Sequence, residues 1–240
     1  MRLGRIVFGL SAILFGILAL MWYDPDTWQT LSQIWKLPSG KAIGGFLMIV
    51  QIAGGIGILF QKTVRWGSVL LIVVYALFSL ACIPGILAAP AVYVHYGSFF
   101  EQFCLLSGAI GLFAPWSRLS RLGIGASAVS FTLSQIFYFS LTAQLVPKWI
   151  PPSQSFWTVV TTIAFGLAAL AILANFRARL ALGLMTFMLV SFGVLIWVPS
   201  VVAHPEVHGN CSELDLTFLI AGAVWVQWDL AASKVTPRQA

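Results

Sequence analysis

Long apolar stretches separated by short polar ones dominate the chain from one end to the other. They run at 5–22, 42–60, 67–88, 97–114, 122–143, 157–174, 180–199 and 212–229. Each is close to the roughly 20 apolar residues that a membrane-spanning helix requires. They do not show the alternation over ~10 residues that marks the strands of a membrane β-barrel. The pattern predicts an all-α transmembrane protein of eight helices, with no room for a soluble domain.

Composition supports the same class of protein. Hydrophobic residues make up 60% of the 240 residues and charged residues only 8%, against roughly 25% charged in soluble domains. This excludes a soluble enzyme, a coiled coil and a disordered chain. The first apolar stretch is expected to be a retained helix, because Ala19-Leu20-Met21 is a poor small-x-small cleavage site for a signal peptidase.

Basic residues predict how the helices are oriented. With eight spans, ten of the thirteen lie on the side of both termini: Arg2, Arg5, Lys62, Arg65, Arg118, Arg121, Arg177, Arg179, Lys234 and Arg238. The other three are Lys36, Lys41 and Lys148. Because cytoplasmic loops carry the excess of Lys and Arg, both termini are expected in the cytoplasm. The net charge of +6 therefore requires no nucleic-acid partner. The ten Trp residues fall near predicted helix ends or in loops, as in an aromatic belt.

Collinear matches between the two halves indicate an internal duplication. A shift of 116 aligns Arg5, Gly9 and Ser11 with Arg121, Gly125 and Ser127, and a shift of 112 aligns Gly97, Glu101 and Ala109 with Gly209, Glu213 and Ala221. Each half contains an even number of spans, so both insert in the same direction and the repeats are parallel. We expect two four-helix repeats, at 1–116 and 117–240.

The first outer loop contains a short amphipathic segment. Asp26 is expected to cap a helix over Thr27–Lys36, with Trp28, Leu31 and Trp35 on one face. Such a helix would lie on the outer membrane surface. The alternative is a lid over a cavity between the spanning helices.

Polar residues inside the apolar stretches are the candidates for function. Glu101 lies about 9 Å beyond His95 along its helix, Glu213 is its repeat counterpart, and Gln51 is central in the second stretch. Ionisable groups within membrane helices are costly and indicate a proton or polar-ligand site. The alternative is that both acids merely favour the positive end of a helix dipole. Between the two, Glu101 is expected to be buried and Glu213 to reach water beside Asp215.

Metal and cofactor motifs are weak or missing in the sequence. His204, His208 and Cys211 share the last outer loop with Glu206, but their spacing fits no standard metal motif, so a polar loop is the favoured interpretation. The three Cys residues contain no C-x-x-C, and there is no P-loop, dinucleotide or haem-attachment motif. We therefore expect no intrinsic cofactor and no catalytic site.

Several short motifs carry a resemblance to a known family. They are Phe137-Tyr138-Phe139, the run Leu145–Pro152, the run Asn175–Ala181, Pro199 and Glu213-Leu214. This series resembles the DoxX-like family of bacterial membrane proteins, clearly over 121–229 and more weakly over 5–114, as two fused copies. The resemblance implies a four-helix bundle per repeat in the bacterial inner membrane. It also implies a link to thiosulfate–quinone oxidoreduction or to complexes that handle oxidative or thiol stress. Some similar sequences carry an acid where Gln51 stands here, and its counterpart near Ile163 is apolar.

Three functions follow as open hypotheses. The first is a non-catalytic membrane subunit or lipophilic-ligand module, with a quinone or lipid as ligand and a separate redox subunit as partner. The second is a small proton-coupled transporter or exporter. The third is a membrane scaffold without a ligand, in which both glutamates point to the lipid headgroups. The nature of the central cavity is expected to distinguish the three.

Overall fold

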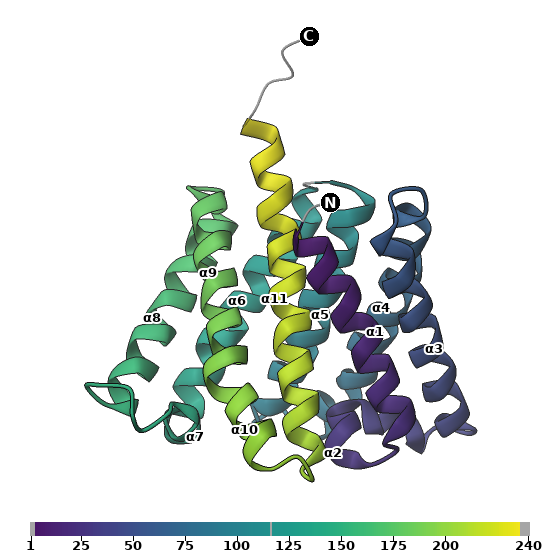
Figure 1. Ribbon diagram of the computed structural model, residues 1–240, viewed down its shortest axis with the longest axis horizontal. Helices are drawn as coiled ribbons and strands as arrows, with labels where there is room; N and C mark the ends of the chain where they lie inside the picture. Colours follow the sequence, from purple (N-terminus) through teal and green to yellow (C-terminus); the bar gives the residue numbers. More distant parts are fainter. Residues whose placement is uncertain (1–2, 116, 236–240) are drawn as a thin grey trace.

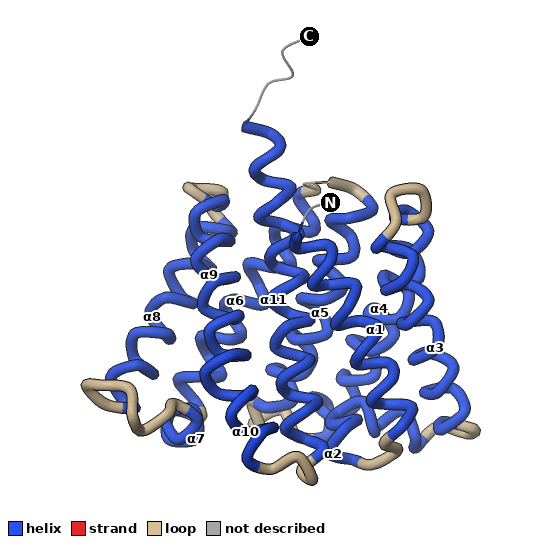
Figure 2. The backbone as a smooth tube through the Cα atoms, viewed as in Figure 1, coloured by secondary structure: helices blue, strands red, loops and turns tan. Residues whose placement is uncertain are grey.

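The computed structural model describes residues 3–115 and 117–235, with side chains described up to residue 232. Helices make up the architecture of this part of the chain, joined by short loops (Figure 2). The long helices are α1 (Leu3–Met21), α3 (Gly40–Leu59), α4 (Val64–Ala88), α5 (Val94–Phe113), α6 (Arg118–Phe137), α8 (Gln154–Leu173), α9 (Ala178–Phe192) and α11 (His208–Val235). The short ones are α2 (Pro25–Trp28), the 3₁₀ helix η1 (Gln29–Lys36), α7 (Phe139–Leu145), the π-turn η2 (Gly193–Trp197) and α10 (Val198–Ala203).

The chain is a multi-pass membrane protein. Within the described residues six helical segments are long and apolar enough to cross a bilayer, or seven if α6 and α7 are counted as one bent span. Large apolar side chains cover their outward faces: Leu167 is 63% exposed, Phe46 63% and Phe187 72%. Such a surface is unfavourable in water and suits the hydrocarbon core of a membrane.

Two of the eight predicted spans differ from the expectation. Helix α5 is long but is not among the six, because polar residues such as Glu101 and Gln102 interrupt its apolar character. The stretch predicted at 122–143 is not one straight helix, since α6 ends at Phe137 and α7 runs at 95° to it. The stretch at 180–199 is one span over Ala178–Ala203 that contains the π-turn η2 just before Pro199. Proline lacks the N–H that a regular helical turn requires, which accounts for the irregular turn at that point.

The long helices follow one another around a ring. Each packs against its neighbour in the order α1, α3, α4, α5, α6, α8, α9 and α11, and α11 returns to α1. Helices α5 and α11 also pack against each other and divide the ring into two lobes. The first lobe contains α1, α3 and α4, and the second contains α6, α8 and α9 (Figure 1).

Glycines allow the helices to approach closely. A Cβ at Gly222 of α11 would lie 2.6 Å from the backbone nitrogen of Phe8 in α1. A Cβ at Gly55 of α3 would lie 2.8 Å from the carbonyl oxygen of Gly9. Both distances are shorter than any tolerated contact, so the backbones of α1, α3 and α11 depend on glycine here.

The connections sort by charge at the two ends of the helical body. Helix α1 begins and α11 ends at the same end, where the connections α3–α4, α5–α6 and α8–α9 also lie (Figure 1). Arg5, Lys62, Arg65, Arg118, Arg121, Arg177 and Arg179 belong to these segments. Lys36, Lys41 and Lys148 belong to the opposite end. Arg2 and Arg238, together with the side chain of Lys234, lie outside the described residues. Below, the two ends are called the basic end and the covered end.

Candidate functional site

The segment Pro25–Lys36 closes the first lobe at the covered end. Asp24, not Asp26, caps it: its Oδ1 accepts a hydrogen bond from the backbone nitrogen of Thr27 at 2.8 Å. The predicted single α-helix over Thr27–Lys36 is also wrong, because Gln29 has a positive φ of 48° and the chain continues as a 3₁₀ helix. We call Pro25–Lys36 the covering segment.

The apolar residues of the covering segment point into the protein. Trp28 is fully buried and Leu31 is 2% exposed. The indole Nε1 of Trp28 donates to the carbonyl of Ala19 at 2.8 Å, and its ring lies 5.3 Å from that of the half-buried Trp35. The segment contacts α3, α4 and α11. The covering segment therefore packs its apolar residues against the helix bundle.

Two polar contacts fasten the covered end to the start of α11. His208 Nδ1 lies 2.8 Å from Asp24 Oδ2, and its ring stacks on Trp22 with centroids 4.0 Å apart and planes at 3°. Burial alone would raise the pKa of Asp24, but hydrogen bonds from His208 and from Thr27 outweigh it and hold that pKa below its usual value. Further along, Gln29 Nε2 donates to Glu213 Oε1 at 2.8 Å. Asp24 and Gln29 therefore connect the beginning of the covering segment to α11.

Glu101 of α5 and Glu213 of α11 face each other beneath this segment, and we call them the acid pair. Their carboxyl groups are near enough to interact electrostatically. The expected contrast in exposure is not found, since both side chains are half-buried and Glu213 is held by Gln29. Cys82 and Cys104, both buried as expected, lie beside Glu101. Two acids on the two central helices are thus brought together inside the helix bundle.

A second polar group lies deeper in the first lobe, and we call Ser11, Gln51, Tyr75 and Asp215 the midplane cluster. Gln51 and Tyr75 are fully buried and Asp215 is 3% exposed. Gln51 Nε2 donates to the carbonyl of Ala12 at 3.0 Å. The Asp215 carboxyl meets the Ser11 hydroxyl and interacts electrostatically with Tyr75. Gln51 is about 16 Å from the start of α3 at 1.5 Å per residue, roughly half of a ~30 Å hydrocarbon core.

Three atoms of the midplane cluster lack a hydrogen-bond partner. Of the six such buried side-chain atoms in the described residues, Gln51 Oε1, Tyr75 OH and Asp215 Oδ2 belong to this cluster. A buried polar atom left unpaired costs about 1–3 kcal/mol. Three of them lie around one short stretch of α1, so this cluster has hydrogen-bonding capacity that the described side chains and backbone do not satisfy. Gln51 was expected from the sequence, whereas Tyr75 and Asp215 were not.

The second lobe contains a comparable polar group whose hydrogen bonds are complete. Gln135 Oε1 accepts from the hydroxyls of Thr161 at 3.2 Å and Thr162 at 2.8 Å. Ile163, the position aligned with Gln51 by a shift of 112, is 56% exposed on the outside of the helix bundle. Its neighbour Thr162 is the inward-facing residue there. The unpaired atoms thus distinguish the first lobe from the second.

The last outer loop does not form a metal site. His204 Nδ1 lies 3.3 Å from Glu206 Oε1 with both side chains exposed, while His208 is engaged by Asp24. Cys211 is half-buried and unpaired. Among the residues that the structure describes, no group of three His, Cys, Asp or Glu side chains is placed to hold a metal ion.

Comparisons with known proteins give no further assignment. No protein-family model, no curated protein and no solved structure matches the chain. Function must therefore be argued from the geometry of the first lobe and from the residues that build it.

Proposed function

We propose that the chain is a DoxX-like protein of the bacterial inner membrane, with both termini cytoplasmic, that binds a lipophilic, quinone-like ligand. It would act as a non-catalytic membrane subunit, with redox or thiol-stress chemistry carried out by a separate redox subunit. The observation that carries this proposal is the group of three unpaired polar atoms, Gln51 Oε1, Tyr75 OH and Asp215 Oδ2, buried midway through the first lobe.

The pairing of helices supports two parallel repeats at 1–116 and 117–240. The last helix of each half packs against the first helix of the other, α5 against α6 and α11 against α1. Arg5 and Arg121 also make related contacts. Arg5 Nη1 donates to Gln61, just after α3, and Arg121 Nη1 donates to the carbonyls of Ile172 and Leu173 at the end of α8. A duplication with a two-fold axis along the membrane normal accounts for this reciprocity.

The unpaired atoms match the chemistry of a quinone and its reduced form. A quinone has two carbonyl acceptors and its quinol has two hydroxyl donors. The Tyr75 hydroxyl donates to a carbonyl, and Gln51 Oε1 accepts from a hydroxyl. Asp215 accepts when ionised and donates when protonated. The acid pair, closer to the covered end, supplies two further carboxyl groups that can accept or donate hydrogen bonds according to their protonation.

A proton-coupled transporter is the second candidate, and one observation favours it. Glu101 and Glu213 lie on α5 and α11, the two helices shared by both lobes, so relative movement of the lobes would change their separation. The scaffold hypothesis expected both acids at the lipid headgroups. The Gln29–Glu213 hydrogen bond and the proximity of the two carboxyls favour the other two hypotheses.

Binding of a short-chain ubiquinone to the purified full-length protein tests the first candidate. Tryptophan fluorescence quenching gives the Kd for wild type, Gln51→Leu and Tyr75→Phe. Loss of one hydrogen bond of about 1.4 kcal/mol should weaken binding roughly tenfold in each variant. The matched control is Gln135→Leu, which removes a buried glutamine of the second lobe and should leave the Kd unchanged. No saturable quenching, or equal weakening by the control, contradicts the proposal.

Proteoliposomes test the second candidate with the same preparation. A transporter predicts proton flux driven by a candidate solute gradient, lost in Glu101→Gln. If flux is present and quinone binding is absent, the transporter replaces the quinone-binding subunit as the function supported by this site.

A further inference from the structure

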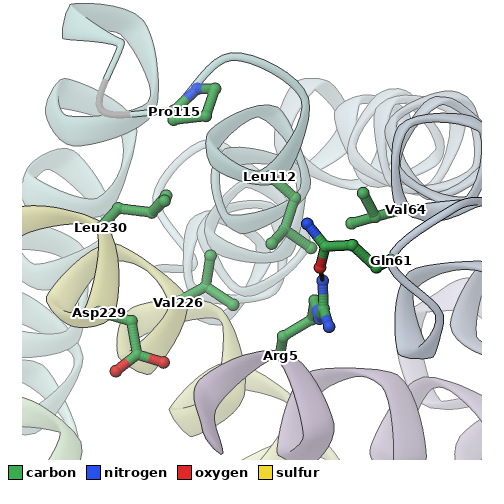
Figure 3. A pocket seen from close by; sticks show the side chains of 8 residues that line it. All are labelled: Arg5, Gln61, Val64, Leu112, Pro115, Val226, Asp229 and Leu230. Atoms are coloured by element: carbon green, nitrogen blue, oxygen red, sulfur yellow. Dashed lines mark hydrogen bonds between the residues drawn. The ribbon is translucent and has the colours of Figure 1, made fainter. Parts of the chain in front are cut away.

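A cavity of about 540 Å³ opens at the basic end of the first lobe, away from the midplane cluster. It lies among α1, α4, α5 and α11 (Figure 3). Its walls combine apolar side chains with a few polar ones: Arg5, Gln61, Val64, Leu112, Val226 and Asp229. An amphipathic lining of this kind fits a ligand with one polar group and an apolar body.

Arg5 is the buried cation of this cavity. Its side chain is 9% exposed, and its Nη1 donates to Gln61 Oε1 at 2.7 Å. Its Nε has no hydrogen-bond partner. Among the described residues no carboxylate forms an ion pair with it. A buried guanidinium paired only with a neutral amide is costly, and an anion would relieve that cost.

Asp229 lines the same cavity and is hydrogen-bonded to the start of α1. Its Oδ2 accepts a hydrogen bond from the backbone nitrogen of Gly4 at 3.1 Å. Figure 3 shows its carboxyl group directed away from the guanidinium, which points toward Gln61. The side of the cavity at Arg5 is therefore positively charged, with apolar Leu112 and Val64 next to it.

Arg121, the arginine aligned with Arg5 in the second half, has its guanidinium hydrogen-bonded within the protein. Its Nη1 donates to two backbone carbonyls at the end of α8, those of Ile172 and Leu173. Those carbonyls lie at the C-terminus of α8, where a cation is stabilised. Arg121 therefore has its partners within the protein, whereas Arg5 lines a cavity and keeps a buried Nε without a hydrogen-bond partner.

We propose that this cavity binds the phosphate group of an anionic phospholipid, with Arg5 as the phosphate ligand. Guanidinium groups bind phosphate through charge-assisted hydrogen bonds, and a free Nε–H supplies one side of the fork. The apolar wall formed by Leu112, Val64 and Val226 accommodates the first carbons of the acyl chains. The basic residues at this end of the protein attract anionic headgroups. This site is independent of the quinone proposal.

Thermal unfolding of the full-length protein in detergent tests the site. Dioleoyl phosphatidylglycerol should raise the Tm of the wild type by about 3–6 °C at ten times its Kd, and dioleoyl phosphatidylcholine should not. Arg5→Gln should abolish the response. Leu112→Trp should also abolish it by filling the cavity while leaving Arg5 in place. Arg121→Gln, the matched control, removes the same charge elsewhere and should retain the full response.

Each other outcome overturns the assignment. An equal shift with phosphatidylcholine shows a general detergent-replacement effect. An equal shift with inorganic phosphate alone assigns the site to a free anion rather than a lipid. A response retained in both Arg5→Gln and Leu112→Trp, or lost in Arg121→Gln, places the lipid elsewhere on the protein.

Discussion

Removing the hydroxyl of Tyr75 is expected to stabilise the ligand-free protein. The ring is fully buried, stacks on Phe8 with centroids 6.1 Å apart and meets Phe78 edge-on at 6.4 Å. The hydroxyl has no hydrogen-bond partner among the described residues. Phenylalanine keeps both ring contacts and removes the unpaired group, which costs about 1–3 kcal/mol. At roughly 2–4 °C per kcal/mol for a chain of this size, the Tm should rise by several degrees.

Tyr93→Phe is a matched control for which the opposite change in Tm is expected. Its hydroxyl donates to the side chain of Ser130 at 3.0 Å, so its removal should cost about 1 kcal/mol and lower the Tm. The assay is thermal unfolding in detergent after delipidation, followed by repetition with short-chain ubiquinone. With the ligand present, the wild type should gain stability and Tyr75→Phe should gain less. If Tyr75→Phe lowers the Tm of the ligand-free protein as much as Tyr93→Phe does, the hydroxyl has a partner within the protein. The binding argument then fails.

Three further predictions follow from contacts outside the midplane cluster. Because the pKa of Asp24 is lowered in the folded protein, its ionised carboxyl stabilises the fold above the unfolded pKa of about 3.9, and this stabilisation is lost as the pH falls through the lower folded pKa. Asp24→Asn should therefore make the Tm fall less steeply at acidic pH, and an unchanged fall contradicts this. Glu101→Gln should raise the Tm more than Glu213→Gln, because only Glu213 accepts a hydrogen bond from the covering segment; a larger gain for Glu213→Gln would refute it. Gly222→Ala should destabilise the protein by several kcal/mol, because the added Cβ would lie 2.6 Å from the backbone of α1. Gly166→Ala, whose Cβ would have its nearest contact at 3.6 Å, should leave the Tm unchanged or raise it in the same measurement.

The helical architecture was predictable because each spanning helix is a local property of about 20 residues. Apolar length indicates where a helix can cross the membrane, and six of the eight predicted stretches coincide with helical segments long and apolar enough to do so, the exceptions being the more polar α5 and the stretch that bends after Phe137. That break was not predicted because Phe137-Tyr138-Phe139 is as apolar as its surroundings. Hydropathy reports how apolar a stretch is and contains no information on where the helix axis bends.

The candidate site was only partly predictable, because it depends on which faces of distant helices meet. Gln51 and the two glutamates stood out as polar residues in apolar stretches. Asp215 was instead assigned to a polar helix start, yet α11 begins at His208, which places Asp215 two turns inside the helix. Tyr75 carries no sequence signal, since one hydroxyl on an aromatic ring hardly changes the hydropathy of α4. The duplication could be proposed from the sequence, but the contact of α11 with α1 depends on three-dimensional closure of the ring.

The contact between the first and last long helices has a consequence for synthesis of the protein. The backbone of Gly4 is hydrogen-bonded to Asp229, 225 positions further along the chain. At about 5–20 residues per second, α1 enters the membrane ~10–45 s before its partner is made. During that interval the face of α1 that contains Gly4 and Phe8 has no α11 to contact and is open to lipid or to an insertion chaperone. Packing of α1 is therefore completed by a helix synthesised more than 200 residues later, and a ribosome that stalls before α11 leaves α1 without this partner.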